Sequence, residues 1–165
     1  TLSRAYSIDS AQTRRTSLVD ASLNRWSGSN TAVYARGMLL GLLTDIAMLE
    51  ASGGKRSVTD LIKEVVTKHN LSTPRTDGNA ALIAIFRSHP ELAGMVERYI
   101  SGSEPFAIDA ALSSAGLELD RAGKNLRVVN KPSGKQKNCL RNSGSIIGRN
   151  REKALVKGHI YALRL

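Results

Sequence analysis

Residues 31–62 read T-A-V-Y-A-R-G-M-L-L-G-L-L-T-D-I-A-M-L-E-A-S-G-G-K-R-S-V-T-D-L-I, and this stretch decides the fold. Its apolar residues recur every three or four positions, which predicts one long helix over residues 32–51 with a broad buried face. Gly53-Gly54 predicts the helix end, because glycine readily adopts the left-handed conformation just past a helix C-terminus. Ser57 to Asp60 resembles a capping box, so we expect a second helix to begin there.

Two glycines inside the long helix, Gly37 and Gly41, lie four residues apart and therefore share one helix face. Each costs about 1 kcal/mol in a helix interior relative to alanine. Such a pair indicates close approach either by another backbone or by a ligand. The sequence leaves these two alternatives open.

Shorter patterns on either side extend this reading to a mainly α fold. Apolar periodicity predicts helices over residues 17–26, 58–69, 80–87, from Pro90 onward, and 108–115. Alternation at residues 117–119 and 126–129 predicts a short C-terminal β-hairpin. We therefore expect a helical bundle of about five helices over residues 17–120, preceded by a loop-like approach segment at residues 1–16.

The charge is concentrated at the C-terminal end. Residues 1–120 hold 12 Lys and Arg against 13 Asp and Glu, whereas residues 121–165 hold 12 Lys and Arg and a single acid, Glu152. We expect this basic tail to be partly disordered or non-native, with the pattern decaying from Lys131 and unrelated or frame-shifted sequence from about residue 142. The tail can bind phosphates nonspecifically. Its only aromatic residue is Tyr161, so base stacking is not indicated and nucleic acid is not the expected partner.

The sequence gives little indication of a membrane-spanning helix or of a disulfide bond. The densest apolar stretch, residues 38–49, contains Thr44 and Asp45 and is shorter than the ~20 residues that a spanning helix needs, so no membrane partner is expected. The single cysteine, Cys139, excludes an internal disulfide and leaves the compartment undetermined. Basic neighbours lower the pKa of a thiol, but an incidental cysteine in a disordered tail is the simpler interpretation.

No catalytic motif for a metal or a phosphate is complete in this chain. A zinc peptidase helix needs two histidines four apart with a glutamate beside the first, and none of His69, His89 and His159 has such a partner. Gly53-Gly54-Lys55 has no strand before it and therefore marks a helix end rather than a phosphate loop. We expect this chain to bind no metal by itself.

Tyr34, just inside the start of the long helix, is the one chemical group that the pattern singles out. Its ring can pack against the core and hydrogen-bond locally, as tyrosines commonly do. Alternatively, its hydroxyl can face a cleft and donate a hydrogen bond to a developing oxyanion.

Five blocks, in this order and spacing, resemble the C-terminal helical part of glycyl aminopeptidase-like zinc metallopeptidases, peptidase family sixty-one of the gluzincin clan. They are S-L-V-D-A-S-L-N-R-W (17–26), V-Y-A-R-G-M-L-L-G-L-L-T-D-I (33–46), S-G-G-K-R-S-V-T-D-L (52–61), V-E-R-Y-I-S-G-S-E-P (96–105) and A-L-S-S-A-G-L-E-L (111–119). The resemblance covers roughly residues 13–120.

The resemblance implies a role for the start of the long helix. In the family, a Tyr-x-[Lys/Arg]-Gly signature opens a helix that faces the zinc site, and Tyr34-Ala35-Arg36-Gly37 matches it. Tyr34 would then be the catalytic tyrosine that stabilises the tetrahedral oxyanion, with Arg36 and Gly37 as substrate-cleft candidates. Zinc would polarise the scissile carbonyl of a peptide substrate and activate water, with a glutamate as base.

The chain departs from the family in its missing parts. The H-E-x-x-H helix and the glutamate ligand, which lie upstream in the family, are absent, and no PDZ-like domain is evident after Val129. The resemblance therefore implies a fragment that is inactive alone, packs against a missing N-terminal zinc-binding domain and depends on zinc held by the parent enzyme. Two alternatives remain: a small basic helical module that binds nucleic acid, and a protein-interaction helical domain with an exposed apolar patch but no polar cleft.

Overall fold

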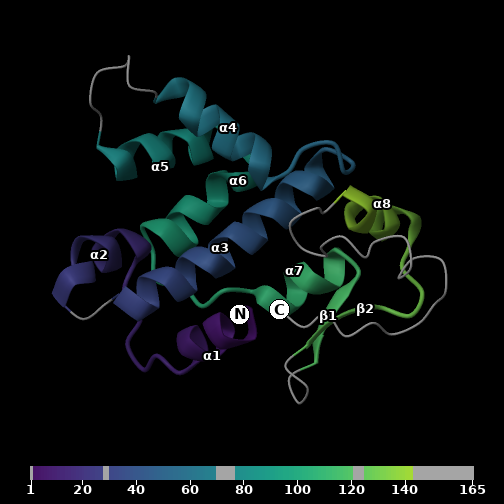
Figure 1. Ribbon diagram of the computed structural model, residues 1–165, viewed down its shortest axis with the longest axis horizontal. Helices are drawn as coiled ribbons and strands as arrows, with labels where there is room; N and C mark the ends of the chain where they lie inside the picture. The colour runs from purple at the N-terminus through teal and green to yellow at the C-terminus, as the bar shows by residue number, and fades with distance from the viewer. Residues whose placement is uncertain (1, 28–29, 70–76, 121–124, 143–165) are drawn as a thin grey trace.

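A computed structural model of the chain describes residues 2–27, 30–69, 77–120 and 125–142 (Figure 1). These residues form a mostly helical fold with eight α-helices and one two-stranded antiparallel sheet. The helices are α1 (Leu2–Ser10), α2 (Leu18–Leu23), α3 (Asn30–Ala51), α4 (Val58–Lys68), α5 (Gly78–Ser88), α6 (Pro90–Met95), α7 (Ile108–Ser114) and α8 (Gly134–Asn142). A 3₁₀ turn η1 (Arg25–Ser27) follows α2, and a π-helical turn η2 (Val96–Ile100) continues α6.

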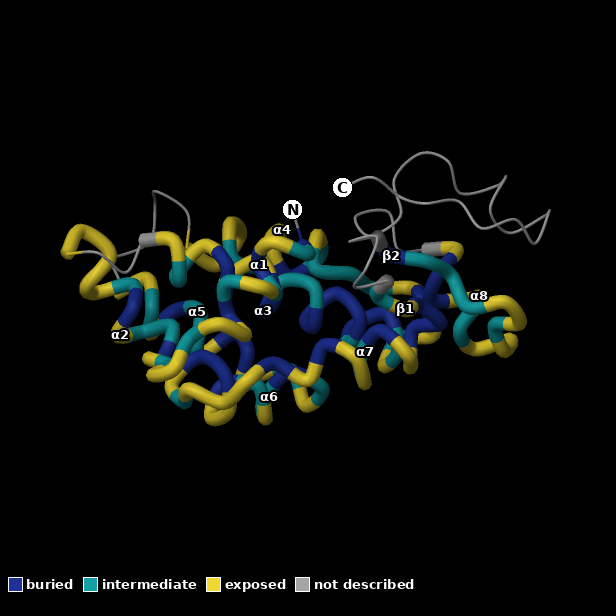
Figure 2. The backbone as a smooth tube through the Cα atoms, turned by 90° about the horizontal axis from the view of Figure 1, so that it is seen from below, coloured by how far each residue is buried: buried dark blue, intermediate teal, exposed yellow. Residues whose placement is uncertain are grey.

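Helix α3 is the centre of the molecule, and the predicted long helix is confirmed. At 22 residues it is about 33 Å long. It contacts α1, α2, α4, α6, α7 and α8, and Figure 1 shows it crossing the fold with α4, α5 and α6 on one side and α1 and α7 on the other. Buried residues line the interior around it (Figure 2).

The length of α3 also corrects one expectation. Residues Thr31–Ala51 are long and apolar enough to cross a membrane by length and composition, contrary to the expectation that no stretch is. However, 56% of their most apolar 18-residue window is buried inside the fold. Burial among neighbouring helices is what the central helix of a packed domain requires.

The ends of α3 and α4 follow the predicted local chemistry. Gly53 and Gly54 have φ angles of 63° and 88°, and the Gly54 amide donates to the Leu49 carbonyl at 2.6 Å. The Ser57 amide donates to Asp60 Oδ2 at 3.0 Å, which completes the capping box at the start of α4. This backbone hydrogen bond is the main reason that the pKa of Asp60 lies below its usual range.

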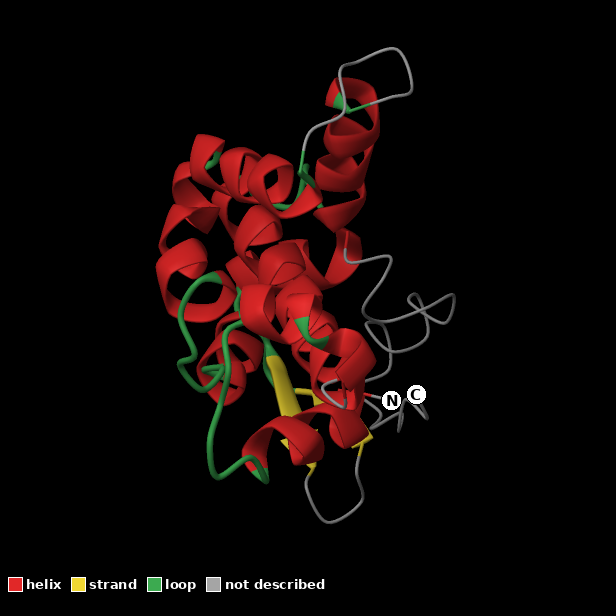
Figure 3. Cartoon of the chain, turned by 90° about the vertical axis from the view of Figure 1, so that its left-hand side faces the viewer, coloured by secondary structure: helices red, strands yellow, loops and turns green. Residues whose placement is uncertain are grey.

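The predicted β-hairpin is present at one end of the helical body (Figure 3). Strand β1 (Leu117–Asp120) pairs antiparallel with β2 (Asn125–Val128), with Leu117 opposite Val128. Gly116, at a φ angle of 78°, makes the turn from α7 into β1.

The expected count of about five helices over residues 17–120 is too low, because six α-helices, α2 to α7, form there, and two further helices outside that range were not predicted. Residues 2–10 form α1 rather than a loop, and residues 134–142 form α8 where a poorly ordered end was expected. Each buries only a few side chains, so neither gives a long periodic pattern. The predictions for residues 143–165 lie outside the described residues.

Cys139 is part of this correction. It is buried on α8, which packs against α3, rather than lying in an unstructured tail. Burial raises the pKa of its thiol, and nearby Glu50 raises it further. The basic neighbours therefore do not produce an activated thiolate here.

Candidate functional site

An apolar groove with a volume of about 480 Å³ lies between α2, α3, α4 and α5. Its α3 side is formed by Tyr34, Gly37, Met38, Gly41 and Thr44. The opposite walls carry mostly apolar side chains of α2, α4, α5 and η2, with Ser22 and Asn79 as further polar lining residues. No charged side chain is among the described residues that line it. The volume falls in the ordinary range for small-molecule sites.

The groove has an open mouth and a closed inner end. Tyr34 is 70% exposed and Met38 is 47% exposed, whereas Thr44, further along the same side of α3, is 1% exposed. The ten-residue step from Tyr34 to Thr44 corresponds to about 15 Å along a helix. The groove therefore deepens as it follows α3 from its second turn towards its middle.

Tyr34 lies at the mouth of the groove, not in the core. The alternative in which its ring packs into the core does not hold, because most of the ring is open to solvent. Its backbone belongs to the second turn of a long helix that is fixed by packing on several sides. The phenolic hydroxyl is thus presented on a rigid support, as a catalytic or binding group requires.

Arg36 lies on the other face of α3, away from the groove, contrary to its expected place in a substrate cleft. It is 0% exposed, and its Nη1 donates to Asp9 Oδ1 of α1 at 2.7 Å. Its Nη2 donates to the Glu104 carbonyl at 3.3 Å, and the guanidinium lies 4.7 Å from the centre of the Phe106 ring. Arg36 therefore ties α3 to α1 and to the segment before α7. Gly37, by contrast, lines the groove.

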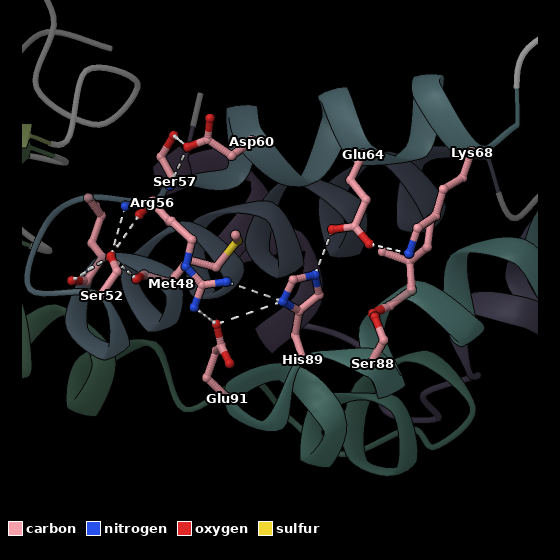
Figure 4. A network of polar contacts seen from close by, with 12 residues as sticks. Met48, Ser52, Arg56, Ser57, Asp60, Glu64, Lys68, Ser88, His89 and Glu91 are labelled. Atoms are coloured by element: carbon pink, nitrogen blue, oxygen red, sulfur yellow. Dashed lines mark hydrogen bonds and ion pairs between the residues drawn. The ribbon is translucent and has the colours of Figure 1, made fainter.

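A polar network, shown in Figure 4, ties α4 to the junction of α5 and α6. His89 Nε2 lies 2.8 Å from Glu64 Oε2, and Lys68 Nζ donates to Glu64 Oε1 at 2.6 Å. Arg56 Nη2 donates to Glu91 Oε1 at 2.7 Å, and its Nη1 lies 3.4 Å from His89 Nδ1. The hydrogen bonds from Lys68 and then His89 lower the pKa of Glu64. Since α4 and α5 are walls of the groove, the network helps to set its width.

From the sequence, His89 stands out only as a candidate metal ligand, and this network is not predicted. Its members lie at positions 56–91, and no regular spacing in the sequence predicts that they contact one another. Among the described residues, no group of three or more His, Cys, Asp or Glu side chains is placed to hold a metal ion. Residues around Tyr34 accordingly do not fit a zinc ion, and any zinc site that Tyr34 serves would be built by other residues.

No family model matches the chain, and no curated protein or solved structure matches it either.

Proposed function

We propose that this chain is the C-terminal helical part of a zinc-dependent aminopeptidase, in which Tyr34 stabilises the tetrahedral oxyanion during peptide-bond hydrolysis. The observation that carries the proposal is the 70% exposure of Tyr34 at the mouth of the groove on α3. It supports the resemblance, because a tyrosine sealed in the core could not reach a substrate.

The surroundings of Tyr34 suit a hydrogen-bond donor. A phenol is a neutral hydrogen-bond donor, and in the proposal the upstream domain that packs over Tyr34 excludes the water to which its ring is open here. Apolar side chains line the groove beside Tyr34, and the helix that carries it is fixed on its far face by the buried pair of Arg36 and Asp9. One oxyanion donor of this kind contributes on the order of 3 kcal/mol to lowering the barrier.

The remaining chemistry belongs to a partner domain. Large apolar side chains stand open on α2, η1 and α4, among them Leu23 at 69%, Trp26 at 84% and Ile62 at 56% exposure. Large exposed apolar side chains of this kind are candidates for a surface that another polypeptide covers. In the proposal, an upstream zinc-binding domain packs over this side, and the chain alone hydrolyses nothing.

The test is made on a longer protein in which this chain follows its zinc-binding domain. Tyr34→Phe keeps the ring and removes the hydroxyl, so kcat should fall about 100- to 1,000-fold while zinc content and KM change little. Tyr6→Phe on α1, which does not line the groove, is the matched control and should retain wild-type turnover. Unchanged turnover in Tyr34→Phe, or the absence of an H-E-x-x-H helix upstream, would refute the proposal.

A protein-interaction domain is the second candidate, because the groove lining carries no charge and the exposed side chains are apolar. The two functions differ in what happens to Trp26. If α2 and η1 pack on an upstream domain, Trp26 becomes protected from hydroxyl-radical footprinting in the longer protein. A Trp26 that remains reactive there, together with an inert Tyr34→Phe, would favour the interaction domain.

A further inference from the structure

The empty space at Gly37 and Gly41 rules out one of the two alternatives that the sequence left open, close approach by another backbone. A Cβ atom built at either glycine meets no heavy atom within 4 Å. No other backbone therefore approaches α3 closely at these positions. Both glycines line the groove, and their missing side chains are part of its free volume. The open space over both glycines leaves room for a ligand.

Thr44, at the closed end of the groove, points to the same conclusion independently. It is 1% exposed, and its Oγ1 has no hydrogen-bond partner. Buried hydroxyls in folded proteins are nearly always paired, since an unpaired one loses its bonds to water without replacement. Because Thr44 lines the groove, a polar atom of a bound molecule can supply the missing partner.

The lining also limits the chemistry of that molecule. A charged group would leave water without meeting an opposite charge, because no described residue that lines the groove is charged. The path from Tyr34 past Gly41 to Thr44 is about 15 Å long on an α-helix, which suits an elongated chain rather than a single amino-acid side chain. The polar group of the ligand belongs at the inner end, beside Thr44.

We propose that the groove binds a neutral amphiphile with one aliphatic chain, such as a medium-chain alcohol or acyl ester. Its hydroxyl or carbonyl group pairs with the Thr44 hydroxyl, and its chain lies over Gly41 and Gly37 towards the mouth. Met38 and Ile62, both partly exposed and both in the lining, cover the outer end of the chain. This site does not depend on the proposed peptidase chemistry of Tyr34, and it belongs to the chain by itself.

The first experiment titrates the full chain calorimetrically with decanol and, separately, with decanoate. Decanol should bind saturably at one site, and decanoate should bind at least about tenfold more weakly, because its carboxylate finds no cation. Thr44→Val preserves the shape of the side chain and removes the hydroxyl, so decanol should bind about fivefold more weakly. This variant should fold, since Thr44 Oγ1 has no hydrogen bond to lose.

The second experiment fills the groove. Gly41→Leu places a side chain in the free volume and should abolish decanol binding. Gly94→Leu on α6 is the matched control: its Cβ also meets nothing within 4 Å, it is exposed, and it does not line the groove. Both changes raise helix propensity, so loss of fold is not expected and can be checked by circular dichroism.

Three results would overturn the proposal: no saturable binding up to the solubility limit of decanol, equal binding by Gly41→Leu and Gly94→Leu, or unchanged binding by Thr44→Val.

Discussion

The two faces of α3 differ in packing: one is closed in the core and the other lines the groove. The closed face is buried throughout and packs against the rest of the core; it carries Arg36, Leu39, Leu43 and Ile46. The open face runs along the groove and becomes buried only at its inner end; it carries Tyr34, Gly37, Gly41 and Thr44.

The difference lies in how each face treats its polar groups and its volume. On the closed face a whole guanidinium is buried, and Asp9 and backbone carbonyls accept hydrogen bonds from its Nη1 and Nη2, whereas its Nε has no partner. On the open face the Thr44 hydroxyl has no partner and the space over Gly41 is empty. Residues that break local packing rules without compensation are expected where a protein binds something. The adjacent residues Arg36 and Gly37 thus serve the two faces separately, one as an anchor and one as part of the groove.

The largest effect is expected from breaking the buried pair on the closed face. Asp9→Ala leaves the Arg36 charge buried without its carboxylate and should lower the free energy of unfolding by about 3–5 kcal/mol. Glu97→Ala breaks an ion pair of similar length, 2.6 Å to Arg87, but with both side chains more than half exposed, and should cost less than about 1 kcal/mol. Urea denaturation of both variants measures the contrast. Equal losses would mean that the pair does not fix the closed face.

Neighbouring positions on α3 sharpen the comparison next. Leu39→Ala removes a fully buried side chain from the closed face and should cost about 2–5 kcal/mol. Met38→Ala, one residue earlier on the open face, truncates a side chain that is 47% exposed and should cost about 1 kcal/mol or less. The two midpoints of urea unfolding provide the test, and similar losses at both positions would contradict the division into two faces.

Much of this architecture was predictable because its signals are local. The helix over residues 32–51, its glycine stop, the capping box at Ser57 and the hairpin all depend on residues a few positions apart, and each was predicted. Helices α1 and α8 depend instead on tertiary contacts with residues far away in the sequence. Asp9 needs Arg36, 27 residues later, and α8 buries Cys139 and Leu140 on distant elements.

The position of the candidate site was predictable from the sequence, but the burial and hydrogen bonding of its residues were not. The placement of Tyr34 at a helix entrance and the glycine pair at 37 and 41 indicated a special face of the helix. The sequence could not show that Arg36 is wholly buried, since charged residues are rarely so unless paired. Nor could it show that the Thr44 hydroxyl lacks a partner, because that depends on how α2, α4 and α5 meet around it.

A smaller effect tests whether the space over the open face is free. Gly41→Ala should raise the free energy of unfolding by about 1 kcal/mol through helix propensity alone, as Gly94→Ala on α6 should. Gly116→Ala should do the reverse, because Gly116 has a φ angle of 78° and an added Cβ would lie 2.9 Å from Gln136 Cβ. Denaturant unfolding of the three variants provides the comparison. If Gly41→Ala lost stability while Gly94→Ala gained it, something would already fill the groove.

The smallest effect concerns the walls of the groove and depends on pH. Because hydrogen bonds from Lys68 and His89 lower the folded-state pKa of Glu64, its contribution to stability is present above the reference pKa of 4.5 and is lost as the pH falls through the folded-state value. Glu64→Gln should therefore be less stable than the wild type at neutral pH, by less than about 1 kcal/mol, and the difference should vanish in acid. Urea midpoints of both proteins between pH 7 and pH 3 measure this convergence. A difference that stays constant across that range would mean that the Glu64 charge does not hold α4 against the α5–α6 junction, and that the open face keeps its width by apolar packing alone.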